Sequence, residues 1–161
     1  MPYKYHKWLT ALFQYAVVVC TFISGCYVVE YSVAAYQPLA TKPVYALVNR
    51  DSHSLFIGLF KTEKAMTIVG FVLLAAILCG AIFCILHIVA DDKRYVKAVT
   101  AASVFQTLLL GGWGLLIGSN SWSNTKVQYL YTPGTLFYVM LGVCVAWIAV
   151  NVWACLNKKD A

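Results

Sequence analysis

The 161-residue chain is 61% hydrophobic and only 11% charged, whereas a typical soluble domain is about 45–50% apolar and about 25% charged. Its polar side chains are too few to cover a water-facing surface, and its apolar content excludes a disordered chain. The net charge of +6 comes from scattered basic residues. This scatter argues against a nucleic-acid partner and favours contact with the anionic headgroups of a lipid bilayer.

Four segments lack Asp, Glu, Lys and Arg: residues 8–29, 65–90, 98–125 and 127–157. Each exceeds the about 20 apolar residues that a helix needs to cross a bilayer. We therefore predict membrane-spanning helices near 8–36, 65–90, 96–118 and 132–156, with outer loops near 37–64 and 119–131. Short connections favour antiparallel neighbours. The predicted fold is an all-α integral membrane protein, an up-and-down four-helix transmembrane bundle that forms a single domain over residues 1–161.

The basic residues predict the orientation, because they concentrate on the cytoplasmic side of membrane proteins. Seven lie on the side of the two termini: Lys4, Lys7, Lys93, Arg94, Lys97, Lys158 and Lys159. Five lie on the other side: Lys42, Arg50, Lys61, Lys64 and Lys126. We expect a multi-pass protein with both termini in the cytoplasm. The sequence does not identify the membrane.

Polar residues inside the apolar segments could form one buried layer. Gln14, Gln106 and Asn151 lie at about 9, 13 and 9 Å from the cytoplasmic ends of their predicted helices, at about 1.5 Å per residue. His87 lies at the edge of this layer. The layer either joins the helices by hydrogen bonds or lines a narrow path for an ion or a small solute. His6 is expected outside the bilayer.

The first outer loop contains a patch of large apolar side chains around Gly58: Leu55, Phe56, Ile57, Leu59 and Phe60. The patch either caps its own bundle or binds another protein, since exposed apolar patches mark interfaces. In the third predicted helix, Gly114 and Gly118 form a G-x-x-x-G pattern that allows close helix packing. We predict that the patch and this pattern together form an assembly interface, with Phe56 and Phe60 in a contact between chains.

The six cysteines all fall inside the predicted helices. Their spacing does not place ligands on one helical face, so no metal site is expected. They are interpreted as small packing residues. Cys155, which lies close to Lys158 and Lys159, is a candidate for S-palmitoylation.

The arrangement of the predicted elements resembles the claudin-like and MARVEL tetraspan proteins. The shared features are four spans, a longer first outer loop, the short inner turn Asp91-Asp92-Lys93-Arg94 and a shorter second outer loop. The resemblance covers most of the chain and implies a protein that shapes membranes, forms lateral strands or organises junctions. Residues 37–64 contain no Trp and no Cys, so the W-x-x-G-L-W…C…C signature of claudins is absent and no site residue follows from the resemblance.

No predicted soluble domain remains to hold a nucleotide, a cofactor or a polymer substrate. We therefore expect no catalytic residues, no metal and no cofactor. The leading hypothesis is a structural or scaffolding membrane protein that assembles laterally, either with copies of itself as a homo-oligomer or with other membrane proteins. Two alternatives stay open: a small channel or transport subunit that uses the amide layer, and an accessory subunit of a large membrane complex.

Overall fold

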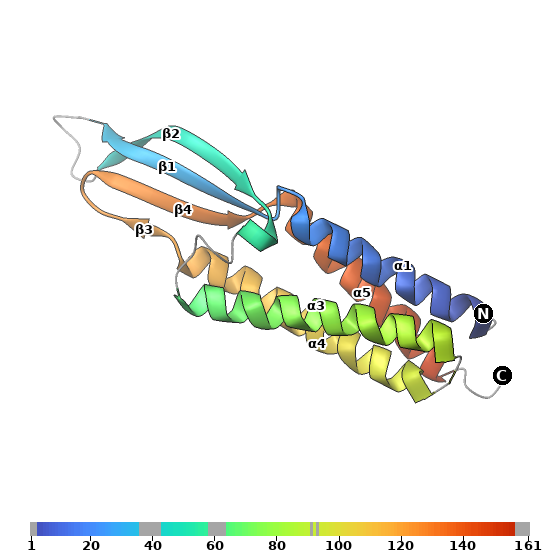
Figure 1. Ribbon diagram of the computed structural model, residues 1–161. Coiled ribbons are helices and arrows are strands. Elements are labelled where there is room, and N and C mark those ends of the chain that lie inside the picture. The colour runs from blue at the N-terminus through green and yellow to red at the C-terminus, as the bar shows by residue number, and fades with distance from the viewer. Residues whose placement is uncertain (1–2, 36–42, 58–63, 91, 93, 157–161) are drawn as a thin grey trace.

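The computed structural model describes residues 3–35, 43–57, 64–90, 92 and 94–156. Figure 1 shows a bundle of helices and a sheet that projects beyond one end of the bundle. The helices are α1 (Tyr3–Phe22), α3 (Lys64–Ala90), α4 (Arg94–Ser119) and α5 (Thr135–Leu156). The strands are β1 (Tyr27–Ala35), β2 (Val44–His53), β3 (Trp122–Ser123) and β4 (Val127–Pro133). The predicted all-α fold is therefore wrong, because the chain combines helices with a four-stranded antiparallel sheet.

The error begins in the first predicted helix, which ends at Phe22 rather than near residue 36. Gly25 follows with a φ of 110°, a backbone conformation that glycine adopts far more readily than other residues. The next nine residues, 27–35, form β1. They are rich in Val and Tyr, which favour strands. A segment without charges can therefore contain a helix followed by a strand, and counting charges does not separate the two.

The two predicted outer loops meet in one sheet, with the strand order β2-β1-β4-β3. Strand β1 lies between β2 and β4 and is antiparallel to both. The pairing of β1 with β2 contains an irregularity: Tyr31 faces Asn49 and Ser32 faces Leu47, so Val48 is an extra residue. Such a bulge increases the local twist of the strands.

A close contact between two glycines joins the sheet to the bundle. The Gly134 N–H donates to the Cys26 carbonyl at 2.9 Å, and the Leu136 N–H donates to the Gly25 carbonyl at 3.0 Å. A Cβ atom at Gly134 would lie only 2.1 Å from the Gly25 carbonyl oxygen. Because no side chain fits there, the start of α5 is fixed directly against the start of β1.

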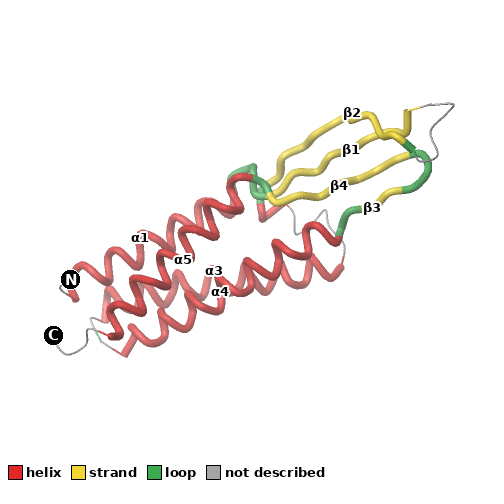
Figure 2. Tube along the Cα trace, turned by 180° about the vertical axis from the view of Figure 1, so that it is seen from behind, coloured by secondary structure: helices red, strands yellow, loops and turns green. Residues whose placement is uncertain are grey.

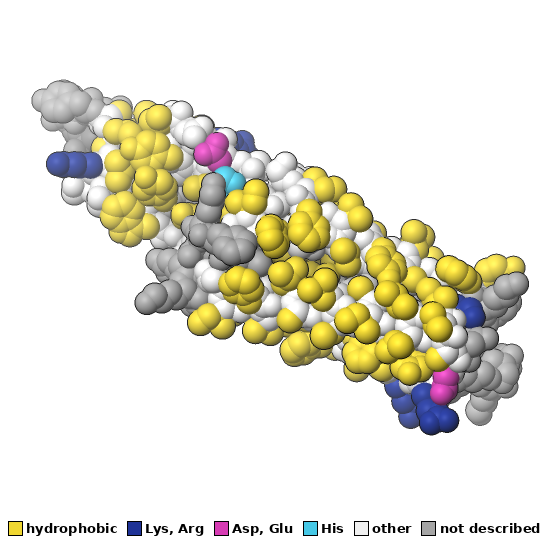
Figure 3. Space-filling view, viewed as in Figure 1, with side chains coloured by type: hydrophobic (Ala, Val, Ile, Leu, Met, Phe, Trp, Pro, Cys, Tyr) yellow, Lys and Arg dark blue, Asp and Glu magenta, His cyan; other side chains and the backbone are white. Residues whose placement is uncertain are grey.

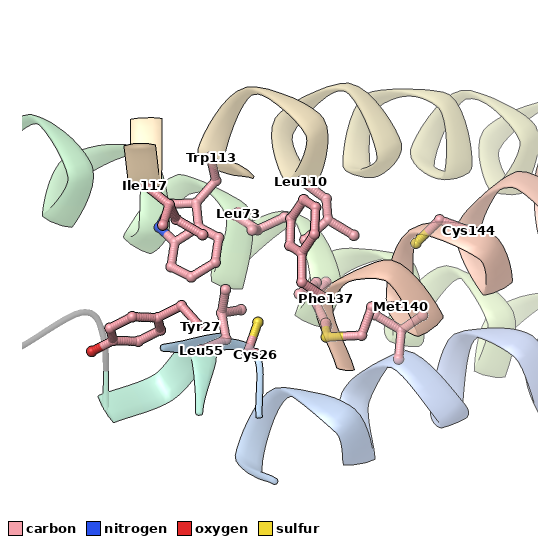
Figure 4. Packing of buried hydrophobic residues seen from close by; sticks show 12 residues of the cluster. Cys26, Tyr27, Leu55, Leu73, Leu110, Trp113, Ile117, Phe137, Met140 and Cys144 are labelled. Atoms are coloured by element: carbon pink, nitrogen blue, oxygen red, sulfur yellow. The ribbon is translucent and has the colours of Figure 1, made fainter. Parts of the chain in front are cut away.

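The interior of the bundle follows a regular spacing. The buried residues of α4 are Val96, Val99, Ser103, Gln106, Leu110, Trp113 and Ile117. Those of α5 are Phe137, Met140, Cys144, Trp147 and Asn151. Intervals of three and four alternate in both series, as in helices that pack side by side at a small angle. Figure 4 shows how Trp113, Ile117 and Phe137 of these series lie beside Cys26, Tyr27 and Leu55 where the bundle meets the sheet.

Three helical segments among the described residues are long and apolar enough to cross a membrane: Thr67–Ala90, Arg94–Ser119 and Thr135–Leu156. Their outer surfaces are apolar as well, with Val89, Leu108 and Leu115 exposed by 76%, 69% and 82%. Such exposure is unfavourable in water and expected in lipid.

The prediction of four membrane-spanning helices is wrong, because α1 is not among these three segments. Its sequence includes His6, Lys7, Thr10 and Gln14, which lower its hydropathy. Helix α1 nevertheless packs against α3 and α5. Figure 2 shows that α1 begins and α5 ends at the same end of the bundle, opposite the sheet.

Candidate functional site

The four residues of the predicted polar layer are all fully buried inside the bundle. Gln14 lies on α1, His87 on α3, Gln106 on α4 and Asn151 on α5, each with 0% exposure. They do not form a single layer. Instead, Gln14 pairs with Gln106, while His87 and Asn151 both contact His6 of α1.

The first cluster is an amide pair. Gln14 Nε2 donates to Gln106 Oε1 at 2.9 Å and to the Ile77 carbonyl at 2.6 Å. Gln106 Nε2 donates to Cys144 Sγ at 3.4 Å. A Cβ atom at Gly80 would lie 2.7 Å from Gln14 Nε2, so the glycine provides the room that the amide occupies. The pair therefore links all four helices.

The second cluster lies nearer the end of the bundle that is opposite the sheet. Thr10 Oγ1 donates to Asn151 Oδ1 at 2.9 Å, and His6 Nε2 lies 3.1 Å from the same oxygen. With this amide orientation, His6 Nε2 carries a proton, because an amide oxygen can only accept. His6 Nδ1 then accepts from His87 Nε2, which lies 3.4 Å away.

Sequence reasoning missed His6 and Thr10. His6 was given no part in the polar layer, but it is 1% exposed and contacts side chains of α3 and α5. The signal was present in the spacing: His6, Thr10 and Gln14 follow one another at intervals of four and therefore share one face of a helix. A polar stripe of this kind on an otherwise apolar helix indicates an inward face.

The chemistry available to these clusters is limited. The described residues contain no group of three or more His, Cys, Asp or Glu side chains that could hold a metal ion. On the sheet side of the amide pair, the bundle interior is apolar, with Leu73, Leu110, Phe137 and Met140 at most 4% exposed. This apolar layer favours a role in helix packing over conduction.

We expect Gln14 and Gln106 to contribute jointly to stability. Single changes of either residue to Leu should weaken the bundle slightly, because leucine is compatible with an apolar interior. A double-mutant cycle should give a coupling free energy of about 0.5–2 kcal/mol. The measurement is reversible unfolding in detergent, followed by circular dichroism. A coupling energy indistinguishable from zero would contradict the view that this pair holds α1 against α4.

The residues of the predicted assembly interface are separated in the structure. Leu55 is fully buried in the core of the chain, and the Phe56 ring packs on Phe22 of α1, with 5.3 Å between centroids. Ile57 is 42% exposed. Leu59 and Phe60 lie outside the described residues.

The two glycines of the G-x-x-x-G pattern also differ from each other. A Cβ atom at Gly114 would lie 2.2 Å from the Phe137 ring of the same chain, so this glycine admits α5. At Gly118, no described atom from outside its own stretch of helix lies within 4 Å of such a Cβ position. Gly114 therefore serves packing within the bundle.

A different apolar surface lies on the sheet. The strand register places Tyr27 and Val29 on one face near the bundle, and five further side chains on the same face. We call these five the aromatic face: Tyr31, Val33, Trp122, Val127 and Tyr129. Tyr31 and Tyr129 have ring centroids 5.0 Å apart, and those of Trp122 and Tyr129 are 6.1 Å apart. Val33, Trp122 and Tyr129 are 37%, 52% and 36% exposed. Figure 3 shows hydrophobic side chains gathered over the sheet as well as along the helices.

The opposite face of the sheet carries both polar and apolar side chains. Its polar members are Glu30, Ser32 and Gln128, and Arg50 of β2 pairs with Glu30 at 3.4 Å. Two exposed leucines, Leu47 and Leu130, lie on this face as well. Cross-strand pairs of opposite charge stabilise a sheet modestly at exposed positions. The five members of the aromatic face carry no charge, but strand β2 adds Asn49 and Asp51 to the same side of the sheet, opposite Tyr31 and Val29.

Cys26 and Tyr27, at the junction between sheet and bundle, are poor nucleophiles. Burial raises the pKa of the Cys26 thiol to about 12, with a further increase from Cys20. Burial also raises the pKa of Tyr27 to about 12, with smaller contributions from Tyr131 and Cys26. Both groups therefore stay protonated near neutral pH.

Cys155, the candidate for S-palmitoylation, lies partly buried near the end of α5. Its Sγ is 3.6 Å from Thr100 Oγ1 on α4, and both residues line a groove between these helices.

Comparison with known proteins gave no relative, because neither a protein-family model nor a curated protein matches the chain. The function is therefore argued from the geometry of the bundle and the sheet.

Proposed function

We propose that this chain is a structural membrane protein that assembles laterally with copies of itself through the aromatic face of its sheet. The observation that carries the proposal is the exposure of Val33, Trp122 and Tyr129 on strands that project beyond the bundle. Apolar side chains gathered outside a membrane mark protein interfaces.

The sheet is a single layer at the end of the bundle (Figures 1 and 2). Sheets normally bury one apolar face against a second layer of structure. In this chain, the part of the face formed by Tyr27 packs on the bundle, where the Tyr27 and Trp113 rings have centroids 6.0 Å apart. The aromatic face lies farther from the bundle, and no second layer among the described residues covers it, so a second layer from another chain would complete it.

A second copy fits this surface in the required orientation. The strands run in roughly the same direction as the helices (Figure 1). A two-fold axis parallel to that direction would bring two aromatic faces together and keep both bundles upright in one membrane. Two sheets packed face to face in this way lie about 10 Å apart and interdigitate their side chains. Such a contact is closed and uses the same patch on both copies.

Both termini lie in the cytoplasm in this proposal, and the sheet lies on the other side of the membrane. The excess of basic residues on the side of the termini supports this orientation. The common position of the start of α1 and the end of α5 is compatible with it.

Cross-linking in native membranes tests the proposal. Val33→Cys places a thiol on the aromatic face, and Ser32→Cys places one on the opposite face at the next position of the same strand. A short membrane-impermeant bismaleimide should give a dimer band with Val33→Cys and little with Ser32→Cys. The unmodified chain provides the background from its own cysteines. Equal cross-linking of both variants would argue against a contact through the aromatic face.

A further inference from the structure

A groove of about 490 Å³ runs along the outer surface of the bundle between α4 and α5. It lies at the end of the bundle opposite the sheet, where α4 begins and α5 ends. Its lining combines small and apolar side chains with one basic residue: Lys97, Ala101, Val104, Phe105 and Leu108 of α4, and Cys155 of α5.

The lining is suited to a hydrocarbon chain. Val104, Phe105 and Leu108 are exposed by 39%, 54% and 69%. Thr100 also lines the groove, but its hydroxyl already donates to the Val96 carbonyl at 2.7 Å. Among the lining residues, Lys97 carries the only charge.

The length of the groove matches one leaflet of a bilayer. Lys97 and Leu108 are eleven residues apart on α4, which corresponds to about 16 Å along the helix axis. Half of the hydrocarbon thickness of a bilayer is about 15 Å. Because α4 is long and apolar enough to cross a membrane, the groove would extend from the headgroup level at Lys97 to the middle of the bilayer at Leu108.

We propose that this groove binds one anionic glycerophospholipid, with an acyl chain against Ala101, Val104 and Leu108 and the phosphate beside the Lys97 ammonium. Charge complementarity favours an anionic headgroup over a zwitterionic one. Among the described residues, the cation nearest to Lys97 in sequence is Arg94, which is paired with Asp92 at 3.1 Å, whereas no ion pair involves Lys97 in the same part of the chain. The lipid would also fill the groove between α4 and α5 and cover Cys155. This inference goes beyond the proposed assembly and does not depend on it.

Native mass spectrometry of the full-length protein tests this site with two lipids of identical acyl chains, phosphatidylglycerol and phosphatidylcholine. One phosphatidylglycerol should bind about fivefold more tightly than phosphatidylcholine, the preference expected from one lysine at a membrane surface. Lys97→Gln should abolish the preference. Lys126→Gln, a matched change at an exposed position next to β4, should retain it. Ala101→Leu should weaken the binding of both lipids, because it fills the groove.

Three results would overturn the proposal. The first is equal affinity of the unmodified chain for the two lipids, and the second is an equal effect of Lys97→Gln and Lys126→Gln. The third is an intact mass of the purified chain that exceeds 17.8 kDa by one acyl group sensitive to hydroxylamine. If Cys155→Ser removed that added mass, the occupant would be a covalent chain on Cys155 rather than a bound phospholipid.

Discussion

Replacing Trp113 by alanine should lower the free energy of unfolding by about 3–5 kcal/mol, the range for truncating a large buried aromatic side chain. Trp113 is fully buried where α4 meets the sheet. Its ring contacts the Tyr27 ring edge-on at 6.0 Å and lies 6.4 Å from the Phe137 ring. Figure 4 shows it beside Ile117 and above Tyr27 and Leu55. The truncation would leave a cavity shared by the bundle and the sheet.

Trp153→Ala provides the matched control, because Trp153 of α5 is 40% exposed. Its effect should stay below about 1 kcal/mol, since no closed cavity forms at an exposed position. Both variants can be compared by reversible unfolding in detergent, followed by tryptophan fluorescence and circular dichroism. Similar effects of the two changes would show that Trp113 does not hold the sheet to the bundle.

The bundle helices were the most predictable part of the fold. The predicted bounds 65–90, 96–118 and 132–156 lie within three residues of those of α3, α4 and α5. These helices consist of long apolar segments with clear ends, such as the charged turn that precedes Arg94. Their length alone distinguishes them from strands.

The sheet could not be predicted in the same way. Strand β1 follows α1 without an intervening charge, and its partner β4 lies about one hundred residues later in the sequence. Strand β1 is stabilised by backbone pairing with segments that are distant in the sequence, and the local pattern of apolar residues does not reveal such pairing. Tyr27, Val29, Tyr31 and Val33 occupy every second position, which is the spacing of one face of a strand. This pattern was not recognised because the same residues had been assigned to the first predicted helix.

The buried polar clusters were predictable in part. Gln14, Gln106 and Asn151 stand out because amides are rare in apolar helices, and each is buried. His6 was overlooked because the uncharged segment that predicted the first helix begins at Trp8, after Lys7, and so excluded it. The hydrogen-bond partner of each amide depends on how its helix is rotated about its axis and shifted along it relative to its neighbours. Those quantities are set by packing details such as the space at Gly80.

The mass of the native particle in lipid nanodiscs tests the central claim, lateral self-assembly through the aromatic face, most directly. The unmodified chain should form particles that contain at least two copies of the 17.8 kDa polypeptide. The double variant Val33→Ser/Trp122→Ser removes the two most exposed side chains of that face. A symmetric contact would lose four apolar side chains, each worth about 1.5–3 kcal/mol when buried. Because Val33 and Trp122 are only 37% and 52% exposed in a single chain, the low end of this range applies, and dimerisation should weaken on the order of 10⁴-fold.

The control is Leu47→Ser/Leu130→Ser, which changes two leucines on the opposite face of the sheet with exposures of 58% and 37%. We expect single-chain particles from Val33→Ser/Trp122→Ser, with helical content unchanged, and particles of the original mass from the control. Self-assembly through the aromatic face would be contradicted if Val33→Ser/Trp122→Ser kept the original particle mass, or if the unmodified chain were already monomeric.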